Sequence, residues 1–375
     1  MSAFLRGALL GAGFGFVLYK VGATRYSRVM GMLTLRDTKV MKFAFTAIGV
    51  ASLLYGLAAA LDLAEGWSLV PRTMPYLGAA HVLGGALFGL GMGVSGLCPG
   101  TCVAKAGGRG GEKKLAAPAA IAGLVAGVLI YEAVKDPLLA AGVIAANQKP
   151  LTVHGALGLP YAAVALVWGA LFLAVAVVVD RLSSEKTYEP ARAPRTVLDR
   201  IRGEWSWPVA GVAAGLLVVL ATADGGYLGF SGAILAAVGG VAHLVGHPLE
   251  VVPRVTDDIL WRAALIAGVF PGAWLAHRVS LPLRGAAPGV PAKVLDPRAI
   301  ATSFSSAAVM TVGALIGGGC TTGAFIAAWP TLSVGSLAMA GTFFVVSMLV
   351  SNTRLLVLHS YDLGAAQAAG ERVYD

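Results

Sequence analysis

Ten apolar segments alternate with polar connections along the chain. In the first half they are 3–19, 40–61, 77–97, 115–134 and 159–180, and in the second half 207–222, 228–246, 259–277, 301–317 and 333–351. A helix needs about 20 apolar residues to cross a bilayer, and several of these segments are at or below that length. Short segments interrupted by glycine beside polar turns are typical of half-helices and re-entrant loops. The pattern predicts an all-α polytopic membrane protein.

Composition strengthens this interpretation. Hydrophobic residues make up 57% of the 375 residues, charged residues only 13%, and the mean hydropathy is +0.78. A soluble domain carries roughly 25% charged residues. The 50 glycines suit a membrane bundle, in which small residues let helix backbones approach closely.

Lys and Arg lie mostly between the apolar segments and give a net charge of +9. Basic connections favour the cytoplasmic side, so we expect 20–42, 105–114 and the linker 183–205 to be cytoplasmic. Asp62 and Glu65 are expected on the other side of the membrane. The linker divides the chain into membrane halves 1–182 and 206–375. The basic residues form no stripe interleaved with aromatics, so we expect a lipid bilayer and no nucleic acid as a partner.

Two glycine-framed cysteine turns stand out, SGLCPGTC at Ser95–Cys102 and GGGCTTG at Gly317–Gly323. Pro99 cannot continue a helix, and glycine permits unusual backbone angles, so the preceding helix is expected to stop within the membrane. The turns lie in a weak internal repeat, 84–108 against 312–330. A fainter pair of segments, 15–28 and 221–233, aligns the position of Thr24 approximately with that of Ser231. Such halves commonly face each other across the membrane, which predicts an inverted-repeat helical bundle with short re-entrant helices at the cysteine turns.

Other cysteine chemistry fits less well. Three cysteines do not make a disulfide framework, and the 98–102 spacing is CxxxC instead of the redox CxxC. A zinc site needs about four ligands, but no histidine or carboxylate stands at motif spacing, and His81, His243 and His247 are interpreted as packing or interfacial residues. We therefore expect no metal, no cofactor and no catalytic residue.

The GLCPGT and GGGCTTG turns and the doubled layout resemble the YeeE/YedE family of sulfur-compound transporters. The resemblance implies thiosulfate uptake across a bacterial inner membrane, a relay of the anion between cysteines on the central axis, and a small cytoplasmic sulfur-carrier protein as partner. Cys98 and Cys320 match the two turn cysteines. A further family cysteine falls at Thr24 or its neighbour, and Cys102 is extra. Either Cys102 supplies the third sulfur or the substrate differs from thiosulfate.

Thiosulfate is a dianion, and a thiolate on its path would repel it. Apolar burial keeps a thiol protonated, so we expect neutral thiols at Cys98 and Cys320. The predicted transport path contains Cys98, Cys320, Cys102, Thr24, Gly96, Gly100, Thr321, Thr322, Gly323 and Ser231.

Two other classes of function stay open at this point. One is a membrane thiol–disulfide oxidoreductase that uses Cys98, Cys102 and Cys320. The other is a structural or regulatory membrane subunit with inert cysteines. Lys20, Arg25 and Lys105 could attract anions to a cytoplasmic mouth or serve only as topology signals.

Overall fold

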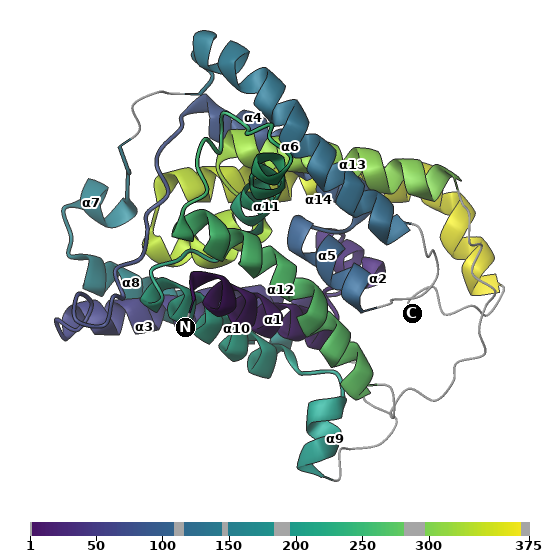
Figure 1. The fold of residues 1–375 in the computed structure, drawn as a ribbon. Helices are drawn as coiled ribbons and strands as arrows, with labels where there is room; N and C mark the ends of the chain where they lie inside the picture. Colours follow the sequence, from purple (N-terminus) through teal and green to yellow (C-terminus); the bar gives the residue numbers. More distant parts are fainter. Residues whose placement is uncertain (1, 109–115, 145–148, 184–195, 281–296, 369–375) are drawn as a thin grey trace.

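The computed structural model describes residues 2–108, 116–144, 149–183, 196–280 and 297–368, and in these ranges it contains helices and connections but no β-strand (Figure 1). The first half contains α1 (Ala3–Val21), α2 (Tyr26–Leu33), α3 (Lys39–Ala60), α4 (Ala79–Ser95), α5 (Pro99–Gly107), α6 (Ala116–Ala140), α7 (Val153–Leu157) and α8 (Tyr161–Leu182). After α9 (Val197–Arg202) come α10 (Trp207–Ala223), α11 (Phe230–Leu244), α12 (Asp257–Ser280), α13 (Pro297–Gly317), the π-helix η2 (Thr321–Ala327), the 3-10 turn η3 (Trp329–Thr331) and α14 (Val334–Ala368).

Each of the ten predicted apolar segments coincides with one of these helices. Eight helical stretches within the described residues are long and apolar enough to cross a membrane, and α10 and α11 are apolar but shorter. The prediction of an all-α polytopic membrane protein is confirmed. Residues 184–195, which form most of the predicted linker, lie outside the described residues, as do Arg109, Lys113 and Lys114.

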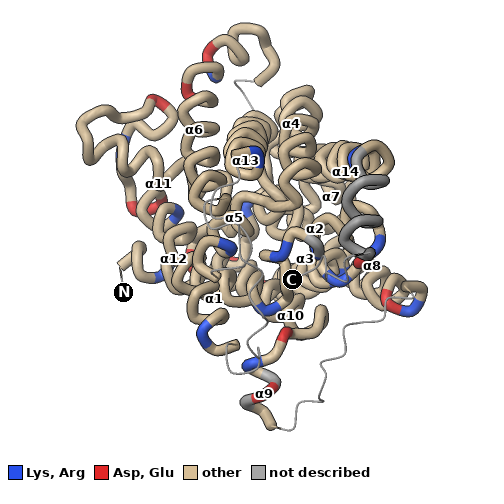
Figure 2. The backbone as a smooth tube through the Cα atoms, turned by 90° about the vertical axis from the view of Figure 1, so that its right-hand side faces the viewer, with Lys and Arg blue, Asp and Glu red and all other residues tan. Residues whose placement is uncertain are grey.

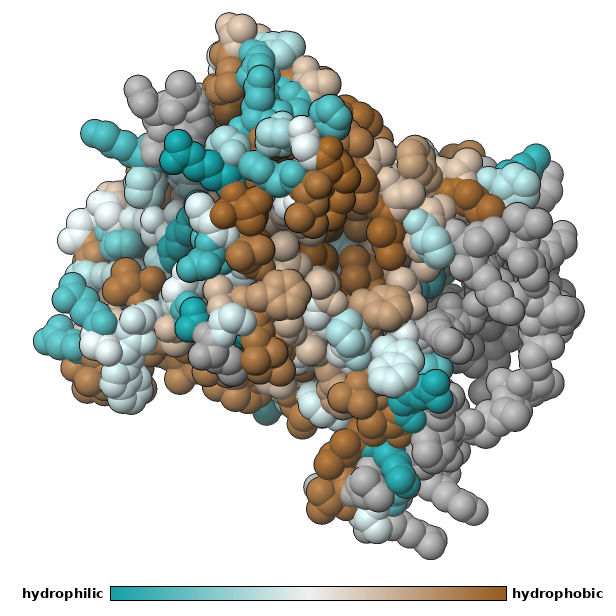
Figure 3. Space-filling model, viewed as in Figure 1, coloured by the Kyte–Doolittle hydropathy of each residue, from teal (hydrophilic) through white to brown (hydrophobic). Residues whose placement is uncertain are grey.

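The surface fits a lipid environment. Hydrophobic residues gather in a broad band over the middle of one face, with hydrophilic residues toward its left side and top (Figure 3). Large apolar side chains are exposed on the spanning helices, including Leu129 on α6, Val167 on α8 and Phe270 on α12. The long helical stretches carry few charges, and Lys and Arg gather at helix ends and connections (Figure 2).

Helices of the first half pack against helices of the second half. Helix α1 packs on α12 and α10 on α3, while α4 packs on α14 and α6 on α13. Helices α4 and α13 also pack on each other. Two repeated halves would produce this pattern, and the division at 183–205 stays a prediction.

The bundle has two distinguishable ends. Lys39 at the start of α3 lies with Glu204, which precedes α10, at what we call the linker end. The opposite ends of α3 and α10 lead into the 61–78 connection and the turn before α11, and we call this the cavity end. Helix α5 runs toward the linker end, because Gly108 lies against the Tyr19 ring at the end of α1. The η2–η3 segment runs toward the cavity end, where the Ser333 hydroxyl donates to the Met74 carbonyl over 2.8 Å.

Candidate functional site

The first cysteine turn joins α4 to α5. Gly96 ends α4 in the left-handed region with φ of +61°, and Cys98 is extended directly before Pro99, the first residue of α5. The Cys98 backbone N–H donates to the Thr101 hydroxyl over 2.7 Å, and that oxygen lies 2.9 Å from the Cys98 carbonyl and 3.4 Å from Sγ. Thr101 therefore fixes the position of the Cys98 sulfur.

The second turn joins α13 to η2. Gly318 is left-handed with φ of +89°, and an added Cβ there would lie 2.7 Å from the Met74 side chain. Cys320 is fully buried and immediately precedes the π-helical turn that begins at Thr321. Isolated π-helical turns are rare and occur frequently at functional sites.

The two turns meet inside the bundle. Cys98 and Cys320 lie close enough for their sulfurs to interact electrostatically, and the Thr321 side chain lies beside Cys98. The Thr321 Oγ1 atom is buried, and among the described residues no nitrogen or oxygen atom bonds it, so the Cys98 thiol is the polar group it faces. Two thiols and one hydroxyl from opposite halves of the chain thus converge.

A cavity connects the second turn with the cavity end. We call it the inner cavity; it measures about 110 Å³ and is lined by Arg72, Thr73, Met74, Pro75, Tyr227, Gly229, Ser231, Gly232, Arg262, Gly318, Gly319 and Gly323. An outer cavity of about 260 Å³ shares Arg72, Tyr227 and Arg262 with it and adds Ser68, Val70, Thr222, Gly225, Gly226 and Asp258. Their shared residues make the two cavities neighbours, with two arginines at the junction.

The first turn is covered where the second is open. An added Cβ at Gly96 would lie 2.7 Å from the Tyr26 ring, and one at Gly100 would lie 2.2 Å from the Phe230 ring. Aromatic rings therefore fill the space beside Gly96 and Gly100, two glycines of the predicted transport path, whereas Gly323 lines the inner cavity. The structure thus exposes the Cys320 turn toward the cavity end and leaves the Cys98 turn packed.

The other predicted path residues lie around these turns. Cys102 is buried one helical turn beyond Cys98, and its N–H donates to the Cys98 carbonyl over 2.9 Å. Thr322 is buried in η2, and Ser231 lines the inner cavity. Thr24 is buried in the short connection between α1 and α2.

Several residues that shape the site carry no sequence signature of their own. Tyr227 donates its hydroxyl proton to the Gly323 carbonyl, and burial followed by the nearby Cys320 raises its pKa, so the hydroxyl stays protonated at neutral pH. His81 accepts from the Leu77 N–H over 2.8 Å at Nε2, so Nδ1 carries the proton that bonds the Gly317 carbonyl over 2.8 Å. This histidine, interpreted as a packing residue, fixes the end of α13.

The packing interpretation also holds for His243, whose Nε2 lies 2.8 Å from the Val252 carbonyl. Within the described ranges, no three His, Cys, Asp or Glu side chains come together as a metal-binding group. All three cysteines are free thiols.

These features define a class: a multi-span helical membrane protein in which two interrupted helices bring thiols together beneath a basic cavity. The chain belongs to the sulphur transport family, YeeE/YedE, which it matches over residues 26–349. The family resemblance is confirmed, and the protein is a sulfur-compound transporter. The oxidoreductase alternative is not favoured by this match. No curated protein matches the chain at a significant level. Thr24 lies two residues before the matched region begins.

Proposed function

We propose that this protein takes up thiosulfate, or a related small sulfur-containing anion, across a bacterial inner membrane by passing it along buried neutral thiols. The observation that carries the proposal is the convergence of Cys98, Cys320 and the buried Thr321 hydroxyl beside the inner cavity. A thiol is a weak hydrogen-bond donor, and a soft terminal sulfur is a suitable acceptor for it. Each transfer exchanges one S–H contact for another, so no covalent bond changes.

Anion access begins at the cavity end. Arg72 is exposed and Arg262 half-buried where the two cavities meet. Clefts lined by one sign of charge raise the local concentration of oppositely charged ligands. The Asp258 carboxylate, 3.0 Å from Arg262 Nη2, partly offsets one of the two arginines.

The order of the thiols follows from their depth. Cys320 lies at the turn that the inner cavity reaches, Cys98 lies beside it, and Cys102 lies one turn further toward the linker end. Helix α5 begins at this point, so its N-terminal dipole favours an anion near Cys98. We propose this order for the relay, with Cys102 in place of the cysteine missing at Thr24.

Basic residues at the linker end support a cytoplasmic location for that side and for 183–205. The anion would then leave toward the cytoplasm, where the family resemblance suggests a small sulfur-carrier protein as acceptor.

Uptake of ³⁵S-thiosulfate by cells producing wild type, Cys98→Ala or Cys320→Ala tests the proposal. Each variant should lose roughly tenfold or more of the rate per amount of membrane-inserted protein, because a lost donor leaves the desolvated anion unsatisfied. Uptake unchanged in both variants would overturn the relay and favour inert cysteines.

Acid-quenched alkylation during uptake separates the relay from redox cycling. The relay keeps all three thiols reduced throughout transport. A cycling pair would instead be found partly oxidised.

A further inference from the structure

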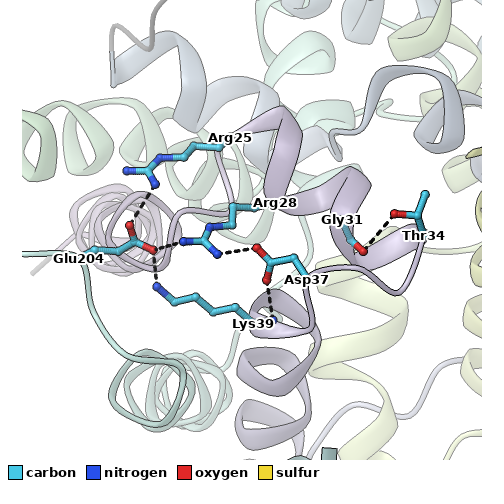
Figure 4. A network of polar contacts seen from close by, with 7 residues as sticks. All are labelled: Arg25, Arg28, Gly31, Thr34, Asp37, Lys39 and Glu204. Atoms are coloured by element: carbon cyan, nitrogen blue, oxygen red, sulfur yellow. Dashed lines mark hydrogen bonds and ion pairs between the residues drawn. The ribbon is translucent and has the colours of Figure 1, made fainter. Parts of the chain in front are cut away.

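Three cations surround one carboxylate at the linker end (Figure 4). Glu204 Oε2 accepts from Arg25 Nη1 over 3.0 Å, and Oε1 accepts from Arg28 Nη2 over 3.2 Å. Lys39 Nζ also donates to Oε1. Both carboxylate oxygens are thus engaged by side chains of two different helices and the connection before α2.

This cluster is partly enclosed. The side chains of Lys39, Arg28, Glu204 and Arg25 are 10%, 18%, 21% and 28% exposed. Asp37 orients it from the other side, since its carboxylate accepts from Arg28 and from the Lys39 backbone N–H. Within the described part of the chain, these three cations pair with the carboxylates of Glu204 and Asp37.

Glu204 is ionised at neutral pH. Burial raises its pKa, but Lys39 and then Arg25 and Arg28 lower it, and the net result is a pKa below the ordinary value. Gly22 lies beside this carboxylate and has a left-handed backbone with φ of +85°. Glu204 therefore presents a full negative charge to the three cations.

The Glu204 carboxylate belongs to the connection between α9 and α10. Residues 202–205, which we call the strap, join α9 to α10 across the end of α1. The Lys20 ammonium donates to the Arg202 carbonyl over 2.9 Å, and the Trp205 N–H donates to the Lys20 carbonyl over 2.8 Å. Glu204 thus reaches the cations from a short segment, while Arg28 and Lys39 belong to the bundle.

Arg25 is the chain neighbour of the residue that covers the Cys98 turn. It immediately precedes Tyr26, and the Tyr26 ring covers Gly96, two residues before Cys98. An anion that leaves Cys102 toward the linker end would approach this cluster.

We propose that Arg25, Arg28 and Lys39 form a binding site for a small divalent oxyanion, occupied in this structure by Glu204 as an internal substitute. The arriving anion displaces the carboxylate, and the strap returns when the anion leaves. The inference rests on the proposed function only in placing the site on the exit route.

Equilibrium binding of ³⁵S-sulfate to purified full-length protein tests the site. Sulfate carries the oxyanion charge without a thiol-seeking sulfur, and a background with Ala at 98, 102 and 320 removes the relay. In that background Glu204→Gln should bind sulfate about tenfold more tightly or better, since the competing charge is gone. Addition of Arg25→Gln should abolish the gain. Equal affinity with and without Glu204→Gln would overturn the proposal.

A second measurement leaves Glu204 in place, so it holds even if Glu204→Gln misfolds. In the same cysteine-free background, Gly203→Cys reports access to the strap through its alkylation rate. Sulfate should raise that rate several-fold over chloride at equal ionic strength, because a divalent oxyanion displaces Glu204 and frees the strap. Equal rates in the two salts would contradict the proposal. Neither assay requires transport, so failure of the relay and failure of this site are distinguishable.

Discussion

Two threonines beside Cys98 differ in what their hydroxyls bond. Thr101 accepts from the Cys98 N–H and fixes the turn, whereas Thr321 Oγ1 is buried beside the Cys98 thiol and bonds no nitrogen or oxygen atom of a described residue. A thiol is only a weak hydrogen-bonding partner, so a ligand or water would satisfy this buried hydroxyl better. The first threonine therefore has a structural role, and the second is available to an anion.

The isosteric change Thr321→Val should reduce thiosulfate uptake with little effect on the thermal stability of the purified protein, because the only polar group that its hydroxyl faces among the described residues is a thiol, a weak hydrogen-bonding partner. The matched change Thr101→Val should destabilise the protein by about 1 kcal/mol, as the loss of a helix cap does. Thermal unfolding and uptake, measured on both variants, check the contrast. Equal destabilisation by the two changes would contradict it.

Glu204 makes stability depend on pH. Its pKa is lowered in the folded state, so its ion pairs stabilise the fold at neutral pH and are lost as the pH falls from the ordinary value of 4.5 through the lower folded value. The melting temperature of wild type should drop over this acid range more than that of Glu204→Gln. A parallel pH dependence of the two proteins would show that Glu204 contributes nothing to stability.

At this scale the sequence indicates the cysteine turns but not their neighbours. Glycine, proline and cysteine within a few residues are visible because each has a known backbone consequence. Arg72, Tyr227 and Arg262 lie in connections or on a helix without a pattern, and only the fold brings them together. Of the two glycines in the first turn, Gly96 has the expected unusual backbone angle, whereas Gly100 lies within the regular helix α5, and the open sides of both receive aromatic rings.

At the scale of helices, small residues set the spacing on which the turns depend. Helices α4 and α13 cross at Gly84, where an added Cβ would lie 2.3 Å from the Gly317 nitrogen. Gly317 directly precedes the Cys320 turn, so this crossing positions the turn relative to α4.

Gly84→Ala should therefore destabilise the protein by about 2 kcal/mol or more, since the backbones must separate. Gly341→Ala on α14 is the matched control, because no atom lies within 4 Å of its added Cβ. That change should be neutral or stabilising by about 0.5–1 kcal/mol, as expected for glycine in a helix. Thermal unfolding in detergent checks both, and similar melting temperatures for the two variants would contradict the role of the crossing.

The spans were predictable because long apolar stretches bounded by charges have few alternatives in a bilayer. The start of α5 was predictable from Pro99. The π-helical geometry of Thr321–Ala327 was not, because no local residue pattern distinguishes it from an α-helical turn, and its aromatic contact, Phe325 with Trp329 at 4.6 Å between ring centroids, forms only in the folded chain.

At the scale of the whole molecule, the two ends differ. The cavities open at the end that carries Arg72 and Arg262, while the opposite end holds the Glu204 cluster with its cations already paired. This asymmetry agrees with the proposed entry of an anion from the cavity end.

Arg72→Gln should raise the KM for thiosulfate uptake several-fold with little change in maximal rate, because it weakens capture and leaves the thiols in place. The effect should shrink at high salt, which screens exposed charges. Arg254→Gln removes the same charge from a residue that lines neither cavity and serves as control. An equal rise in KM for both variants would argue for general surface charge.

The most direct test of the central claim exchanges sulfur for oxygen in both turns. Uptake of ³⁵S-thiosulfate into proteoliposomes should be measured for wild type and for Cys98→Ser combined with Cys320→Ser, at equal protein content. Serine keeps a hydroxyl donor of similar size but removes the soft, weakly hydrated thiol. The relay predicts a loss of most thiosulfate uptake in the double variant. Uptake at the wild-type rate would contradict it and show that the turns need only a polar side chain.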